Sequence, residues 1–345
     1  MLLRTKKAKN SVKTAVICMT AALLCIHAGA QNASWAKEEA AAVGQVTPQE
    51  LEMELTFLTD TLCHGRGTGT KGNTEAAFWI ARQFNEAGLL MLDKTYAKKV
   101  YIRQDVIGRN IVGMIPGAVS VPRDRYIIVG AHYDHLGEIS GKTYPGADSN
   151  ASGTVALISL IEMFSTMKTL GKVYDSNIIF VAFDAKEWSL SGSQEFWNML
   201  DYGRLRDPLT GAAITPDKIS LMVNIDQIGS TLSPIHKGRE DYMIMLGTQS
   251  LKRSQRNFLA ECNRSSGLNM DIGLDYYGSR NFTDVFYRLS DQRVFVDNDI
   301  PAVLFTSGIT MNNNKTWDNV ESLDMDVLHK RIRLIFCWLQ KMLQS

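Results

Sequence analysis

Residues 126–137 read YIIVGAHYDHLG, an apolar run that ends in a polar cluster. The run 126–130 predicts a buried strand, and similar apolar runs predict strands at 110–114, 177–183, 221–225, 242–246 and 302–305. Helical patterns cover 74–87, 152–170 and 325–343. Strands that alternate with amphipathic helices indicate an α/β fold with a mixed, mostly parallel central sheet and helices on both faces.

Polar side chains follow several of these predicted strands. His132 and Asp134 come directly after the run that begins at residue 126, and Asp226 follows the run 221–225. The run 177–183 is followed by Asp184 and by the pair Lys186-Glu187. In open α/β sheets, ligands bind beyond the carboxyl ends of the strands, so we expect these side chains to share one edge.

A further carboxylate, Asp148, lies in the loop GADSNASG (146–153) before a predicted helix. Taken alone, Asp148 is explained as a helix N-cap, and Asp226 as a turn residue. Several buried carboxylates at one edge, however, destabilise a fold unless a cation neutralises them. The pattern therefore predicts a metal site without thiolates, with zinc first and manganese or cobalt next. The spacing of His132 and Asp134 allows the carboxylate to orient the imidazole.

The composition describes a globular chain with little net charge. The 345 residues are 45% hydrophobic, and 37 Lys and Arg face 36 Asp and Glu. These values exclude a disordered chain and a basic nucleic-acid binder. Residues 47–345 show no long linker and no internal repeat, so we expect one domain there.

The N-terminus has the pattern of an export signal. Residues 1–30 contain five basic and no acidic residues, an apolar run at 14–26 and small residues at 28–30. The apolar run is shorter than the ~20 residues that span a bilayer, so we expect cleavage, an exported protein and no membrane anchor. Lipidation at Cys25 is a weaker alternative. Residues 31–46 are expected to form a flexible lead.

The remaining cysteines, Cys63, Cys262 and Cys337, are widely spaced. They show neither a disulfide framework nor the paired spacing of a cysteine metal site. We expect them to pack in the interior, and one disulfide is possible.

Together, six motifs resemble those of the co-catalytic zinc aminopeptidases, a family that includes the glutaminyl cyclases. The motifs are HGRGTGTKGNTEAA (64–77), GAHYDH (130–135), GADSNASG (146–153), FDAKEWSLSGS (183–193), NIDQIG (224–229) and SDQRVFVDNDIPAVLFTSG (290–308). The resemblance covers most of residues 47–345 and implies a zinc-exopeptidase-like fold. It also implies zinc-dependent hydrolysis of the peptide bond after a free N-terminal residue, in which a water bridging two metals is activated by a nearby glutamate.

The resemblance assigns metal-site roles to matching positions. His132 and Asp226 correspond to ligands of one metal, Asp148 to the bridging carboxylate and Glu187 to a ligand of the other metal. Asp134 corresponds to the residue that orients His132.

Two positions depart from the family pattern. Lys186 occupies the position of the general base, and Asn314 occupies that of the last ligand, a histidine in the family. At an effective dielectric near 20, a unit charge about 5 Å from a divalent cation changes its energy by roughly 7 kcal/mol. Lys186 therefore disfavours the second metal.

We hypothesise that the ammonium group of Lys186 replaces that metal and pairs with Glu187 and Asp148, while His132, Asp148 and Asp226 keep one zinc ion or none. In a rival hypothesis, Lys186 is neutral and acts as the base. The sequence thus predicts an exported exopeptidase-type protein with a weakened or single-metal site, acting on peptides with a free N-terminus. The alternatives are a non-catalytic peptide-binding protein and a single-zinc acyltransferase similar to glutaminyl cyclase.

Overall fold

A mixed sheet forms the centre of the computed structural model, which describes residues 35–118 and 124–345. Within these residues, the sheet has the order β1-β3-β7-β4-β8-β11-β9-β10, and β2 also pairs with β3. Its strands are β1 (Leu90–Met91), β2 (Ala97–Arg103), β3 (Val106–Ile115), β4 (Tyr126–His132), β7 (Asn177–Phe183), β8 (Ile219–Ile225), β9 (Tyr242–Leu246), β10 (Asp271–Gly273) and β11 (Ala302–Thr306).

Four neighbouring strands in the middle of the sheet, β7, β4, β8 and β11, run parallel to one another. Antiparallel pairs flank them, β3 with β7 on one side and β9 with β11 on the other. All six strands expected from the apolar runs are present, and the expected mixed, mostly parallel sheet is confirmed. The carboxyl ends of four strands therefore meet at one edge of the sheet.

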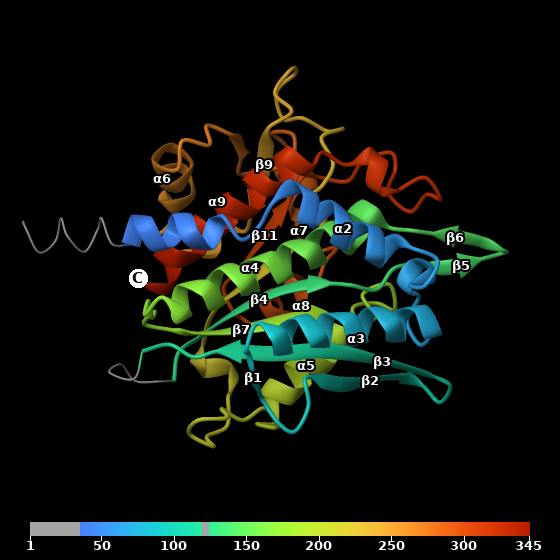
Figure 1. Ribbon diagram of the computed structural model, residues 1–345, viewed down its shortest axis with the longest axis horizontal. Coiled ribbons are helices and arrows are strands. Elements are labelled where there is room, and N and C mark those ends of the chain that lie inside the picture. Colours follow the sequence, from blue (N-terminus) through green and yellow to red (C-terminus); the bar gives the residue numbers. More distant parts are fainter. Residues whose placement is uncertain (1–34, 119–123) are drawn as a thin grey trace, which may run out of the picture.

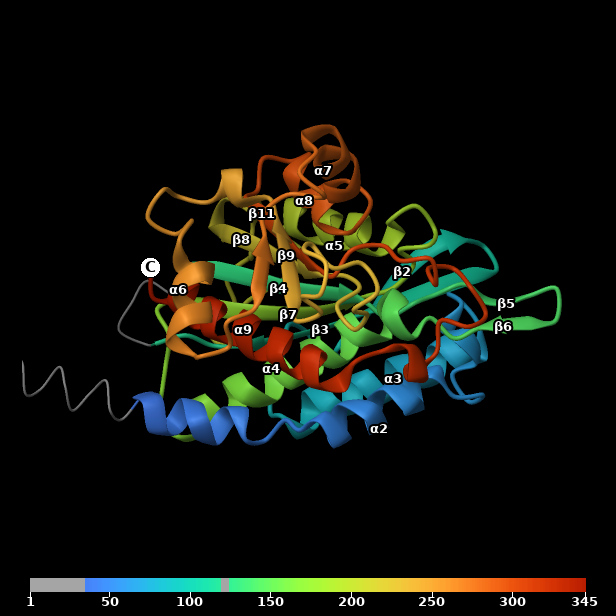
Figure 2. The same ribbon diagram turned by 90° about the horizontal axis from the view of Figure 1, so that it is seen from above.

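Helices cover both faces of the sheet, as Figure 2 shows. On one face lie α2 (Pro48–Thr59), α3 (Lys71–Glu86), α4 (Ser152–Thr169) and α9 (Met325–Leu343); on the other lie α5 (Ser191–Asp201) and α8 (Gln292–Val296). Two further helices, α6 (Phe258–Ser265) and α7 (Arg280–Tyr287), lie between β9 and α8 in the sequence. A small hairpin of β5 (Gly137–Ile139) and β6 (Lys142–Tyr144) projects from the sheet (Figure 1).

Alternating side chains build the two cores. Along β4, Ile127 and Val129 belong to the core that contains side chains of α4 and α9, whereas Tyr126 and Ile128 belong to the core that contains side chains of α5 and α8. This period of two is a consequence of strand geometry. Because both faces are covered, the strand reads as a continuous apolar run rather than an alternating one.

Residues 35–46 differ from the expected flexible lead. Residues 35–43 are helical, and Ala42 and Val46 are buried in the core. The ring of Trp35 packs edge-on against that of Tyr174, with centroids 5.8 Å apart. The expectation was wrong for these residues because their apolar side chains find partners on distant segments. The predicted signal peptide and Cys25 lie outside the described residues.

No helix within the described ranges, 35–118 and 124–345, combines the length and the apolar character needed to cross a bilayer.

Candidate functional site

The central strands deliver the predicted residues to one edge. His132 is the last residue of β4, which lies between β7 and β8. Lys186 and Glu187 follow β7 on one side of it, and Asp226 follows β8 on the other. The parallel register of these strands is therefore what brings the three segments together.

His132 is fully buried and lies next to two aspartates. Its Nε2 is 3.4 Å from Oδ1 of Asp226, and its Nδ1 is 3.1 Å from the backbone oxygen of Asp134. Burial alone would lower the pKa of His132, but the carboxylate of Asp226 raises it to about 10. Conversely, burial favours a neutral Asp226, whereas the charges of His132 and Lys186 hold its pKa below the ordinary range.

Lys186 forms an ion pair with its neighbour Glu187, with 3.1 Å between Nζ and Oε1. Burial alone would lower the pKa of Lys186, but the carboxylates of Asp226 and Glu187 raise it above its ordinary value. Positive charge at this edge thus comes from two side chains, His132 and Lys186. The hypothesised partner Glu187 is present, but the ion pairs of the described residues do not include one between Lys186 and Asp148.

Asp134 joins the β4 end to the loop after β7. Its carboxylate accepts hydrogen bonds from the backbone N–H groups of Lys186 (3.0 Å) and Glu187 (3.1 Å). Its distance to His132 Nδ1 is longer, 3.6 Å. The carboxylate of Asp134 therefore positions the backbone that carries the Lys186–Glu187 pair, and its carbonyl oxygen makes the shorter contact with His132.

Asp148 lies in a short π-helical turn, Ala147–Ala151, which precedes α4. Its Oδ1 accepts hydrogen bonds from the N–H of Gly229 (2.7 Å) and the hydroxyl of Ser152 (3.0 Å). Its Oδ2 is buried without a hydrogen-bond partner. Burial, with repulsion from the carboxylate of Asp318, raises the pKa of Asp148 to about 6. Asp318 in turn accepts hydrogen bonds from the backbone N–H groups of Asp148 and Ser149 and so holds the turn in place.

The buried guanidinium of Arg66 holds together the segments at this edge of the sheet. This role was not predicted from the sequence. The guanidinium donates hydrogen bonds to four carbonyl oxygens, those of Leu58, Tyr133, Pro145 and Gly146. These bonds tie α2 to the end of β4 and to the turn that carries Asp148. The motif HGRG around residue 66 was the signal available in the sequence, but nothing in it reveals these partners.

Asp184 also has a structural position. Its carboxylate accepts hydrogen bonds from Thr68, Asn73, Tyr133 and the backbone N–H of Arg109. The first residue after β7 therefore fastens the sheet edge to α3 and β3. None of these four partners lines the cavity beside Lys186, so the carboxylate of Asp184 stabilises the fold.

A cavity of about 220 Å³ opens beside Lys186 and Asp226. Asn314 lines it with Asn313 and Gln227, so the residue at the expected histidine position does reach the site. Most of the remaining wall is apolar, and Ser290 and Thr306 also line it. The apolar side chains are Leu246, Tyr276, Phe286, Leu289, Leu304 and Ile309. The cleft thus combines a charged end with an apolar pocket.

The donor set differs from a two-metal centre. Glu187 is paired with an ammonium group, and Asn314 supplies a neutral amide. His236, one of the two histidines that follow Asp226 in the sequence, pairs with Asp271 and not with the residues of this site. Within the part of the chain that the structure describes, no group of three or more His, Cys, Asp or Glu side chains is arranged to hold a metal ion.

The fold and the sequence identify the family. The model of peptidase family M28 matches residues 110–338, which include every strand-end motif described above. The chain belongs to peptidase family M28. Leucine aminopeptidase 1 of Trichophyton equinum is 26% identical to this M28 chain over 220 residues, covering 61% of this chain and 51% of that protein. The M28 chain therefore spans about half the length of this curated relative.

Solved structures share the fold of this M28 protein. BSAP, a zinc aminopeptidase from Bacillus subtilis, superposes with a TM-score of 0.63 at 11% identity, covering 87% of this chain and 95% of BSAP. The glutaminyl cyclase of Porphyromonas gingivalis gives a TM-score of 0.61 at 15% identity, covering 86% of this chain and 98% of the cyclase. The expected family and zinc-exopeptidase-like fold are confirmed.

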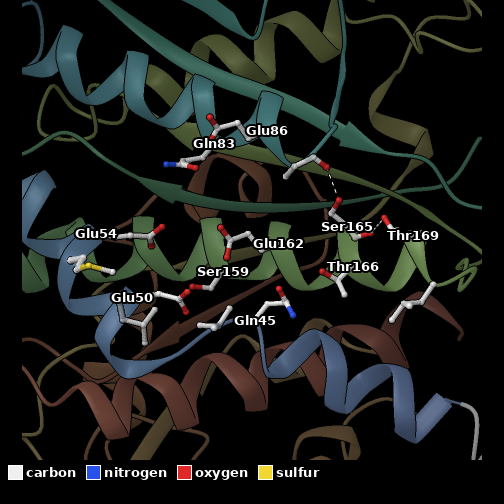
Figure 3. Close-up of a pocket in the computed structure, with 15 residues that line it drawn as sticks. Gln45, Glu50, Glu54, Gln83, Glu86, Ser159, Glu162, Ser165, Thr166 and Thr169 are labelled. Atoms are coloured by element: carbon white, nitrogen blue, oxygen red, sulfur yellow. Dashed lines mark hydrogen bonds between the residues drawn. The ribbon is translucent and has the colours of Figure 1, made fainter.

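A second hollow, of about 560 Å³, lies among the helices α2, α3 and α4 (Figure 3). Glu50, Glu54, Glu86 and Glu162 line it, with several Ser, Thr and Gln side chains. Burial, with repulsion between the glutamates, raises the pKa of Glu54 to about 8 and that of Glu162 to about 7. None of the residues at the strand ends lines this hollow.

Proposed function

We propose that this M28 protein binds the N-terminal part of a peptide in the cleft beside Lys186 and Asp226, and that its hydrolytic activity is weak. The single observation that carries the proposal is the Lys186–Glu187 ion pair, with its 3.1 Å separation at the end of β7. An ammonium group in this position neutralises a carboxylate that would otherwise be available to a second divalent ion.

The side chains that line the cleft are of the types that bind a peptide. Peptidases of this family, including the leucine aminopeptidases similar to this chain, provide the precedent for a peptide. The apolar wall of Leu246, Tyr276, Phe286 and Ile309 suits an aliphatic or aromatic side chain, and the polar amides of Gln227 and Asn313 suit a peptide backbone. A mainly apolar pocket with a few polar groups at one end is typical of small-ligand sites.

A second candidate function, hydrolysis with one zinc ion, has its own supporting observation. His132 Nε2 and Asp226 Oδ1 are 3.4 Å apart, close to the ~3.3 Å expected between two ligands of tetrahedral zinc with bonds near 2.0 Å. Asp148 Oδ2 is buried and lacks a partner. BSAP, a zinc aminopeptidase with the same fold, makes zinc the metal to test. When bound, zinc would supply Lewis-acid chemistry. The resemblance assigns His132, Asp226 and Asp148 as its ligands, and these side chains would have to move together to hold it, because the described residues contain no such group as they stand.

Metal content and activity distinguish the two candidates. Purified protein is loaded with zinc, manganese or cobalt, dialysed, analysed for bound metal and assayed with a panel of aminoacyl chromogenic substrates. For a peptide-binding protein we expect less than one zinc ion per chain, slow or no hydrolysis, and binding of apolar N-terminal peptides. One zinc ion per chain with turnover supports the second candidate, and two tightly held ions contradict both.

A variant with the family residues at the two departing positions tests the role of Lys186. The double variant Lys186→Glu/Asn314→His restores the family residues at the two departing positions, and we expect it to bind two zinc ions. A restored general base raises kcat/KM by about 10²-fold or more. The matched control is Lys94→Glu, the same charge change at an exposed site. If Lys186→Glu abolishes an activity that the unaltered protein has, Lys186 is the base and the proposal fails.

Export by cleavage near residue 30 remains a prediction of the sequence, because residues 1–34 lie outside the described part of the chain.

A further inference from the structure

Two cysteines that are 75 residues apart in sequence meet between α6 and α9, which pack against each other. Cys262 is fully buried, Cys337 is half-buried, and both thiols are free. Cys262 belongs to the main hydrophobic core, Cys337 packs against the same core, and each thiol shifts the pKa of the other. Cys63 lies elsewhere, beside Gly72 at the start of α3. Of the three cysteines that the structure describes, Cys262 and Cys337 are therefore the two that lie near each other.

The two thiols differ in access and in chemistry. Cys337 lines a surface cavity of about 370 Å³, with Ser266 and Lys341 also in its wall, whereas Cys262 does not line it. Hydrogen bonding from Cys262, together with Ser266, lowers the pKa of the Cys337 thiol despite its burial. The same contact, together with burial, raises the pKa of Cys262. A reactive thiol combines exposure with thiolate character, so Cys337 is the expected nucleophile.

We propose that Cys337 and Cys262 form a thiol–disulfide modification site, in which a disulfide oxidant links α6 to α9. The Cys337 thiolate attacks one sulfur of the oxidant, and the other sulfur leaves as a thiolate. Cys262 then loses its proton and attacks Sγ of Cys337, which expels the second thiolate of the oxidant. Two protein thiols are oxidised to one disulfide, and the oxidant disulfide is reduced to two thiols.

The cross-link would enclose the part of the chain that builds the cleft wall. Tyr276, Phe286, Leu289, Ile309 and Asn314 all lie between positions 262 and 337. Closing a loop of this length restricts the unfolded chain and stabilises the folded one. The oxidised site would therefore place these wall residues inside one covalently closed loop of the chain.

The test uses oxidised glutathione as the oxidant. Purified protein is equilibrated in mixtures of oxidised and reduced glutathione, quenched with acid, alkylated in denaturant and digested for mass spectrometry. We expect a cross-linked peptide pair containing Cys262 and Cys337, with Cys63 alkylated throughout. Oxidation should raise Tm by roughly 5 °C or more. Under fully oxidising conditions, absence of this peptide pair overturns the proposal, as does a cross-link to Cys63.

Single variants test the order of attack. Cys262→Ser should trap one glutathione per chain on Cys337, whereas Cys337→Ser should leave Cys262 unmodified in the native protein. Cys63→Ser is the matched control and should form the cross-link as the unaltered protein does. Equal rates of glutathione addition to Cys262 in one variant and to Cys337 in the other would contradict the assigned roles. The mapping in the unaltered protein does not depend on the folding of any variant.

Discussion

The ammonium group of Lys186 lies 3.1 Å from Glu187, and after His132 it is the second charge that holds the pKa of Asp226 low. It therefore supplies, from the chain itself, part of the positive charge that the clustered carboxylates require. The side chains of the pair are only 17% and 21% exposed, so this charge is weakly screened by water.

Replacing Lys186 by Met should destabilise the protein, because Glu187 and Asp226 would lose a compensating charge. Breaking a fully buried pair costs about 3–5 kcal/mol, and the partial exposure here reduces the expected loss to about 1–3 kcal/mol in the free energy of unfolding. Urea denaturation at neutral pH measures it. Lys94→Met, at an exposed position, is the control. Equal stability of the two variants would show that the ion pair does not support the fold.

Replacing Arg66 by Met should have a larger effect. The variant leaves four carbonyl oxygens, of Leu58, Tyr133, Pro145 and Gly146, without their donor. At about 1 kcal/mol or more for each unsatisfied buried group, we expect a loss of at least 3 kcal/mol, measured by chemical denaturation. Arg82→Met, on the exposed face of α3, should change stability by less than about 0.5 kcal/mol. A small loss at Arg66 would mean that water replaces the guanidinium.

Among the elements, the helices α2 and α4 bring Glu54 and Glu162 together at a hollow (Figure 3). Their raised pKa values, about 8 and about 7, mean that the folded protein holds protons that the unfolded chain has released. Stability therefore falls as the pH rises from about 4.5 to about 8.

Replacing Glu54 by Gln should remove part of this pH dependence. At pH 9 we expect the variant to be more stable than the unaltered protein by about 1–2 kcal/mol, a value reduced for partial exposure to water, whereas at pH 4 the two should be equal. Urea denaturation across this pH range measures the difference. The control is Glu52→Gln, an exposed glutamate of the same helix. A pH profile unchanged by Glu54→Gln would contradict the assignment.

At the scale of the whole molecule, residues 35–46 pack against the core on the face of the sheet that α2, α3, α4 and α9 cover. Trp35 packs against Tyr174, Glu38 pairs with Lys172 at 3.6 Å, and Ala42 and Val46 enter the core. Removing residues 1–46 should therefore lower the free energy of unfolding by about 2–4 kcal/mol relative to removing residues 1–30. Thermal denaturation of the two truncated proteins tests this. Equal Tm values would restore the expectation of a flexible lead.

Much of the fold could be read from local patterns. The apolar runs at 177–183 and 242–246 correspond to β7 and β9 at both ends, and the predicted helix at 325–343 is α9. The contacts of Asp134 could not be read in this way, because its partners are backbone N–H groups of residues 186 and 187, in the loop after β7. The metal ligands assigned by resemblance remain predictions.

The sequence by itself determined six strands of the central sheet, three of the helices and the polar residues that follow several of these strands, because buried strands need apolar runs and the polar residues after them are local in the chain. It also determined the family, through motifs spread over residues 64–308. Only the tertiary structure decided which charges neutralise one another, which cysteines meet and that residues 35–46 are packed. These outcomes depend on distances between segments far apart in the chain, which local patterns do not specify.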